Sequence, residues 1–410
     1  MSSLHTPAAA AAAPAAPRRV LPAIVFAQLL GISPWFAVNA VMPDLQAAHA
    51  HQGWPAAAVG TLSSSLQLGF IAGTLVFALL AVADRFPARR VFLACAFAAA
   101  ACTLAAAAMA SSYGALLAWR AITGFFLAGI YPVGMKIAAQ WFPRGLGAAL
   151  GWLVGALVVG SAGAHALRAL ASGGAGLPWQ AVFVAVAALC VAAGLAMVWL
   201  VPEPARRPEA PAAGLRLSAL ASIWRDRRVR ASAFGYFGHM WELYTVWVLL
   251  PAILATRLAD SVAVSWWAFA ALGAGALGCI AGGQLVARWG SARVAGFQLA
   301  ASGLCCLAAP WLLQAPLWLF LAWLLLWGVT VAGDSPQFSA LTAANAPRDA
   351  VGSVLTLTKS IGFAISALSI EVFVRAAAGA SLAAVLPWLA LGPLLGLLAL
   401  RPLLGAGPAR

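Results

Sequence analysis

The 410 residues are 64% hydrophobic and only 8% charged, and the formal net charge is +14. Ordinary soluble domains carry about 25% charged residues, so this composition excludes a water-soluble globule and makes a lipid bilayer the expected solvent. The basic residues are scattered between apolar runs, which excludes a basic face that binds nucleic acid. Residues 1–19 begin with an Ala- and Pro-rich stretch that lacks the pattern of a signal peptide, and we expect a disordered tail there.

Long apolar runs recur along the chain, and each is long enough to cross the hydrocarbon as a helix of about 20 residues. Barrel strands show short alternating segments instead, so we expect an all-α integral membrane protein. The predicted spans lie near residues 20–43, 55–82, 91–110, 114–140, 146–168, 177–201, 231–256, 262–286, 293–313, 316–341, 351–374 and 380–400. Glycines at near-helical spacing on the fifth and eighth spans predict close helix packing; they are Gly147, Gly151, Gly155, Gly160, Gly273, Gly275, Gly278, Gly282 and Gly283.

The two halves of the chain repeat each other. Gly124, Gly129, Pro132, Pro143 and Arg144 recur 204 residues later as Gly328, Gly333, Pro336, Pro347 and Arg348. Parallel duplication is a common plan of secondary transporters, whose halves rock around a central site. We therefore expect two pseudo-symmetric six-helix bundles, 20–201 and 231–403, joined by a basic linker at 202–230 and followed by a short tail at 404–410.

The placement of the basic residues predicts the orientation. Under this topology, 18 arginines fall in the tails and in the loops on the side of the termini, whereas the opposite loops hold only Arg168, Arg257 and Arg375. Basic loops stay in the cytoplasm because they resist translocation. Both termini are therefore expected to be cytoplasmic, in a multi-pass protein of the cell inner membrane.

With its twelve spans, central basic loop and repeat, the chain resembles the major facilitator superfamily from residue 20 to 403. After the second span this family has the pattern Gly-x-x-x-Asp-Arg-x-Gly-x-Arg-Arg. The chain keeps the acid and three basic residues but has Leu80 and Pro87 in place of the glycines. In the family this loop latches the halves together on the inner side in the outward-open state. The resemblance thus implies a conformational latch built from Asp84, Arg85, Arg89, Arg90, Arg288 and Arg293.

Further motifs refine the resemblance. The segment from Arg120 to Gly124 looks like the family's Arg-x-x-x-Gly signature, which is often tied to proton coupling. The Gly-Pro pair of drug/proton antiporters is replaced by Gly155-Ala156, which disfavours a multidrug exporter. A His-x-Trp-Glu on the seventh span and an Asp-Ser-Pro on the tenth are similar to nitrate/nitrite and cyanate-type porters, but the paired membrane arginines of nitrate carriers are absent.

Charged side chains within the spans are the default functional candidates, since each costs roughly 2.5–3.5 kcal/mol to insert at the bilayer centre. Asp334 and Lys359 lie about equally far from the same end of neighbouring spans, given a rise of about 1.5 Å per residue. We expect them to pair, either as a static salt bridge or as one that substrate or a proton opens.

Glu242 lies near the middle of the seventh span without an obvious local cation, and His239 precedes it on the same helix face. Burial disfavours the charged carboxylate, so Glu242 is the leading candidate to carry a proton. His239 is expected to share that proton or to bind substrate. The alternative is a neutral Glu242 that is hydrogen-bonded to Tyr or Trp in a packed interface.

Arg120 binds an anionic substrate if its guanidinium is free in a cavity, and is structural or coupling if it pairs with Glu242 or a backbone carbonyl. Lys136 is expected to snorkel to the interface, and Glu371 to reach water at the far end of its span. The first, fourth, seventh and tenth spans line the cavity in the resembled family, which implies further substrate contacts from Trp35, Asn39, Tyr131, Tyr244 and Gln337.

Sequence motifs for other chemistry are missing. There is no phosphate-binding P-loop, nucleophile elbow or zinc-protease motif, and the six cysteines lack metal-ligand spacing. We expect no enzyme activity, cofactor or metal. The predicted function is alternating-access secondary transport by a monomer, with proton-coupled uptake of a small anionic solute. The alternatives are a proton-coupled efflux antiporter for metabolites or drugs, and a non-transporting membrane sensor on the same fold.

Overall fold

The computed structural model describes residues 17–142, 146–173, 176–203 and 214–405, and their regular secondary structure is helical. Twelve helices or helix series in this part are long and apolar enough to cross a membrane, as predicted. Pro143 and Arg144 of the repeat lie outside the described residues. So do most of the N-terminal tail, residues 204–213 of the linker and the last five residues.

The first half contains six spans, and four of them are built from one helix each. Its elements are α1 (Val20–Gly31), η1 (Ser33–Phe36), α2 (Ala37–Ala40), α3 (Met42–Ala48), η2 (Ala50–Gln52), α4 (Ala58–Leu79), α5 (Val82–Arg85), α6 (Ala88–Ala108), α7 (Tyr113–Leu127), α8 (Tyr131–Trp141), α9 (Leu146–Gly173) and α10 (Gln180–Leu200). The first span combines α1, η1 and α2, and the fourth combines α7 and α8.

The second half repeats this plan after the short linker helix α11 (Ala219–Arg225). Its elements are α12 (Arg227–Ala255), α13 (Ser261–Trp289), α14 (Ser291–Leu312), α15 (Leu317–Gly333), α16 (Ser335–Asn345), α17 (Val351–Gly379), α18 (Leu382–Val385), η3 (Leu386–Ala390) and α19 (Leu391–Leu404). The tenth span combines α15 and α16.

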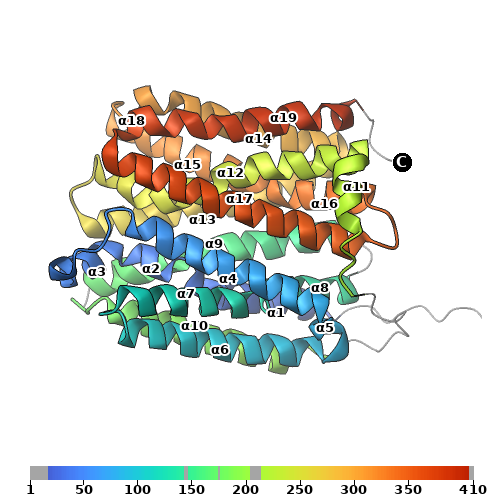
Figure 1. The fold of residues 1–410 in the computed structure, drawn as a ribbon, viewed down its shortest axis with the longest axis horizontal. Coiled ribbons are helices and arrows are strands. Elements are labelled where there is room, and N and C mark those ends of the chain that lie inside the picture. The colour runs from blue at the N-terminus through green and yellow to red at the C-terminus, as the bar shows by residue number, and fades with distance from the viewer. Residues whose placement is uncertain (1–16, 143–145, 174–175, 204–213, 406–410) are drawn as a thin grey trace, which may run out of the picture.

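The two halves form two bundles that lie side by side, the first below the second in Figure 1. The elements α5 and α11 and the end of α19 lie at one end of the molecule, which we call the terminal end. The elements α3 and α18 lie at the other, which we call the far end. The main contacts between the bundles run along two helix pairs, α9 with α13 and α4 with α17.

The fourth and tenth spans are interrupted at matching positions of the repeat. The chain leaves α7 at Leu127 and resumes helix at Tyr131, and it leaves α15 at Gly333 and resumes at Ser335. A proline occupies the first turn of each following helix, where its missing N–H costs no hydrogen bond. Broken helices near the membrane midplane place polar backbone groups where transporters bind their cargo.

Close helix packing explains several of the glycines. A Cβ on Gly124 would lie 1.9 Å from the carbonyl oxygen of Leu66, and one on Gly328, its repeat partner, 1.9 Å from that of Ala271. The predicted packing role holds for the fifth and eighth spans at Gly151, Gly155, Gly160, Gly275, Gly278 and Gly282. It is wrong for Gly147, Gly273 and Gly283, where a Cβ would meet no atom within 4 Å.

Substitution of Gly124 by Ala is expected to lower the melting temperature of the purified protein, because the new methyl group must push α7 away from the backbone of α4. Overpacking of this kind costs about 1–3 kcal/mol or more. Temperature-dependent aggregation followed by size-exclusion chromatography measures it. Gly283→Ala is the matched control and should leave stability unchanged or raise it; equal melting of both variants would contradict the packing argument.

Candidate functional site

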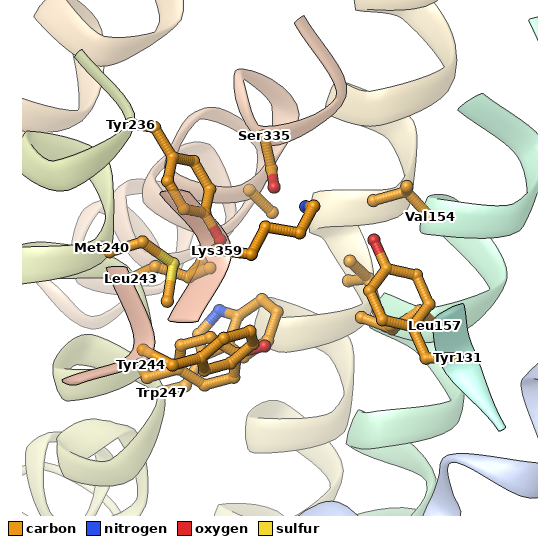
Figure 2. A pocket seen from close by; sticks show the side chains of 13 residues that line it. Tyr131, Val154, Leu157, Tyr236, Met240, Leu243, Tyr244, Trp247, Ser335 and Lys359 are labelled. Atoms are coloured by element: carbon orange, nitrogen blue, oxygen red, sulfur yellow. The ribbon is translucent and has the colours of Figure 1, made fainter. Parts of the chain in front are cut away.

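A small cavity lies between the two bundles near the breaks in the fourth and tenth spans. Its lining comes from α8 and α9 of the first half and from α12, α15, α16 and α17 of the second. It holds about 30 Å³ of space for water-sized molecules, room for about two waters. Figure 2 shows the lining side chains converging on this space. An organic solute would need the bundles to move apart.

Lys359 on α17 extends into the middle of the cavity (Figure 2). Its Nζ lies 5.9 Å from the ring centre of Tyr131 and 5.2 Å from that of Tyr236. Tyr131 belongs to the first half and Tyr236 to the second, so the ammonium group lies between the bundles. Lys359 and Tyr236 also line a second, smaller space beside Phe338 and Thr342 on α16.

The predicted pairing of Asp334 with Lys359 is wrong. Asp334 lies instead against His239, with 2.8 Å between its Oδ1 and the imidazole Nδ1, and both side chains are 1% exposed. Asp334 occupies the break between α15 and α16, which packs against α12, the helix that carries His239. The ring of Tyr236 lies 5.7 Å from that of His239, so Tyr236 stands between the buried pair and Lys359.

Glu242 points away from this cavity and is not part of its lining. Its Oε1 accepts hydrogen bonds from Ser302 Oγ at 2.5 Å and Trp327 Nε1 at 2.7 Å, and Cys306 Sγ lies at 3.1 Å. The side chain is buried among α12, α14 and α15. These contacts match the alternative in which Glu242 is hydrogen-bonded to a tryptophan in a packed interface. The role of Glu242 as proton carrier stays a prediction.

An aromatic cluster closes the cavity toward the far end, and it joins the two bundles. Trp35 stacks on Tyr244 with 5.4 Å between ring centres, and Phe70 lies 4.8 Å from Phe363. Two hydrogen bonds lie beyond this cluster, from Ser64 Oγ to the carbonyl of Ala367 at 3.1 Å and from Thr61 Oγ1 to Glu371 at 3.5 Å. The bundles are therefore held together on the far side.

The other predicted substrate contacts divide into two groups. Tyr131 and Tyr244 line the cavity. Trp35 belongs to the aromatic cluster, Asn39 donates to Ser63 Oγ at 2.9 Å away from the cavity, and Gln337 is buried one turn beyond Asp334. Tyr236 was not predicted, although its position three residues before His239 on a cavity-lining span was an available signal.

Arg120 is buried behind the first span and does not line the cavity. Its guanidinium donates to the carbonyl oxygens of Pro34 at 2.9 Å and Trp35 at 2.7 Å, in the 3₁₀ turn η1 that interrupts this span. The sequence left open whether Arg120 binds substrate or pairs within the protein, and here it pairs with backbone carbonyl groups. Arg120 therefore holds the broken first span in place.

Replacement of Arg120 by Met is expected to destabilise the protein by about 2–5 kcal/mol, because two buried carbonyl groups lose charged donors. Thermal unfolding in detergent measures the loss. Arg120→Lys should restore part of it, since an ammonium group still donates. A Met variant that melts like the wild type but fails to bind anions would instead make Arg120 a substrate ligand.

The predicted latch residues do not join the two bundles in this conformation. Asp84 forms an ion pair with Lys136 of its own half, which the prediction of a snorkelling lysine did not anticipate. Arg89 donates to the carbonyl of Val201 at 2.6 Å and bonds Glu203 at 3.1 Å. The other four side chains are exposed; they are Arg85, Arg90, Arg288 and Arg293.

The loop that carries Asp84 still makes a tight turn without the two family glycines. Ala81 takes the left-handed conformation there, with φ of 49°, which is unfavourable for a residue with a Cβ. The turn directs α5 back toward α8, so that Asp84 reaches Lys136. The loss of the glycines is therefore accommodated by strain at Ala81.

Comparison with known proteins places the fold. The family model of the Major Facilitator Superfamily matches residues 24–370. The human organic anion transporter MFSD10 (TETRAN) has 18% identity and a TM-score of 0.71 over 93% of this chain and 99% of its own. A bacterial homolog of the human lysosomal transporter Spinster, inward-facing and unoccupied, has 16% identity and a TM-score of 0.73 over 96% and 99%. No curated protein sequence matches significantly.

Proposed function

This chain belongs to the major facilitator superfamily and is a multi-pass membrane protein with the fold of alternating-access secondary transporters, and we propose that its cargo is a small anion taken up together with a proton. Lys359 carries the anion part of this proposal. Lys359 is the one Lys, Arg, Asp or Glu in the described lining of the cavity, and no carboxylate lies beside it there. An unpaired cation in a low-dielectric space attracts a negative cargo.

The proton part rests on the pair formed by His239 and Asp334. Their nearest atoms are 2.8 Å apart, so the two groups can share one proton. Sharing it costs less free energy in the membrane than an isolated full charge on either group. The described ionisable groups that interact with Asp334, besides His239, are Tyr236 and Glu242 on α12 and Cys279 on α13, and Lys359 lies against the ring of Tyr236. Tyr236 contacts both His239 and the cavity ammonium, so we propose it as the path by which anion binding alters the proton's environment.

The same proposal includes the orientation and the gate. It has the terminal end in the cytoplasm of a cell with the protein in the inner membrane as a monomer, and the excess of basic residues at that end supports this orientation. The aromatic cluster around Trp35 is the outer gate in its closed position. The conformational latch, which consists of Asp84, Arg85, Arg89, Arg90, Arg288 and Arg293, forms when the aromatic gate opens and the terminal end closes. The halves divide at the linker, 202–230.

Proton flux in proteoliposomes tests the proposal. Vesicles hold a trapped pH-sensitive dye, and inorganic anions and carboxylates are added outside one at a time. Proton-coupled uptake predicts acidification of the lumen that depends on the anion and on the protein. Alkalinisation would indicate the antiport alternative, and the absence of both proton flux and counterflow of every anion would favour a non-transporting sensor.

A further inference from the structure

The walls around Lys359 carry information about the rest of the cargo. Apart from the ammonium, the described lining consists of aromatic and aliphatic side chains with four hydroxyl groups, three of them phenolic. Leu157 on α9 lies across the space from Met240, Leu243 and Trp247 on α12, and Val158 on α9 also lines it. Such a surface gains free energy from covering an apolar body and little from a hydrated one.

The charge count of the cavity limits the cargo to one negative charge. A dianion would bring a second charge into the low-dielectric space without a partner, which is costly. A small inorganic anion would lose its hydration shell and find one ammonium and a few hydroxyl groups in exchange. The bidentate guanidinium that suits such planar or tetrahedral anions is not available here, because Arg120 is engaged with the carbonyls of Pro34 and Trp35.

The position of the ammonium also orients the cargo. Its Nζ lies near the rings of Tyr131 and Tyr236, which come from different bundles, while Tyr244 and Trp247 line the cavity two to three turns farther along α12 toward the far end. A carboxylate at Lys359 would place its hydrocarbon part against these rings. The structure thus provides a charged contact and an apolar contact that one molecule can satisfy together.

From this combination we infer that the cargo is an apolar monocarboxylate, an organic acid with one negative charge and an aromatic or branched hydrocarbon body. The inference rests on the proposed function and specifies the class of anion that the Lys359 cavity accepts. It separates this chain from carriers of nitrate-like anions, which two motifs of the sequence resemble.

Ligand binding to the purified full-length protein in nanodiscs tests the inference, read from tryptophan fluorescence because Trp247 lines the cavity. The probes are phenylacetate, acetate, the neutral phenylacetamide, the dianion 4-carboxyphenylacetate and nitrate. Phenylacetate should bind roughly ten-fold or more tightly than each of the others, since each lacks the apolar body or the single charge. In Lys359→Met, phenylacetate should fall to the affinity of phenylacetamide; Lys136→Met, the other lysine, should bind like the wild type.

The outcomes separate this inference from the proposal beneath it. Nitrate, acetate or the dianion binding as tightly as phenylacetate would overturn the apolar monocarboxylate while leaving Lys359 as an anion site. An unchanged affinity of every anion in Lys359→Met would overturn both. A lack of binding by any carboxylate up to millimolar concentration, in protein that is monodisperse and thermally stable, would also overturn the inference. Lys359→Arg provides a second variant that keeps the charge and should keep the preference for the anion.

Discussion

Lys359→Met is expected to abolish anion-dependent proton uptake, with a loss of roughly 100-fold or more in the initial rate. Two opposite charges about 4 Å apart attract by about 4 kcal/mol at an effective dielectric constant of about 20, and about 1.4 kcal/mol corresponds to a factor of ten in affinity. Methionine keeps the length and apolar stem of lysine, so the cavity shape is preserved while the charge is lost. Dye-loaded proteoliposomes measure the rate.

The controls for this variant are Lys359→Arg and Lys136→Met. The first keeps a cation in the cavity and should retain a measurable part of the flux. The second removes the ammonium that pairs with the half-exposed Asp84, outside the cavity, and should still bind anions. Wild-type flux in Lys359→Met would show that the anion is bound elsewhere.

Asp334→Asn is expected to separate anion movement from proton movement. The amide cannot exchange a proton with His239, whereas the cavity and its ammonium remain. Counterflow of labelled anion should therefore persist near the wild-type rate, while proton uptake per anion should be largely lost. His239→Gln should act in the same direction, and parallel measurement of anion and proton fluxes gives the ratio.

Glu242→Gln is the informative comparison, because Glu242 is the proton carrier favoured by the sequence. Glutamine keeps an oxygen that can accept from Ser302 and Trp327, so the packing should be retained. If the buried pair carries the proton, this variant should keep the wild-type proton-to-anion ratio. Loss of coupling in Glu242→Gln with normal coupling in Asp334→Asn would return the role to Glu242.

Sequence reasoning predicted the spans well because each is a long apolar run between charged or proline-containing loops. The boundary between the predicted spans 293–313 and 316–341 is an example, since α14 ends at Leu312 and α15 begins at Leu317. The breaks in the fourth and tenth spans were not predicted, although the repeated Gly129 and Gly333 with their following prolines mark both. These features depend on local composition and need no knowledge of which helices touch.

The contacts of single side chains were less predictable, since depth along a helix does not give the direction in which a residue points. Asp334 and Lys359 were placed at one level, yet Asp334 contacts His239 on α12 while Lys359 extends into the cavity. Lys136 lies 52 residues from Asp84, and the turn at Ala81 that joins them has lost the expected glycine signal. Partners of this kind follow from the packing of helices and not from their spacing.

The lone ammonium of Lys359 has a consequence for how voltage acts on the carrier. Once an anion is bound, the cavity is close to neutral, whereas the empty cavity carries one positive charge. The membrane potential falls mainly across whichever gate is closed, so the empty cavity has the potential of the side that it faces. If that side is negative, moving the positive charge to the other side costs up to about 2.3 kcal/mol per 100 mV. In Asp334→Asn, where no proton accompanies the anion, net uptake should slow under such a potential while one-for-one anion exchange should not, and potassium-diffusion potentials in proteoliposomes would reveal the difference.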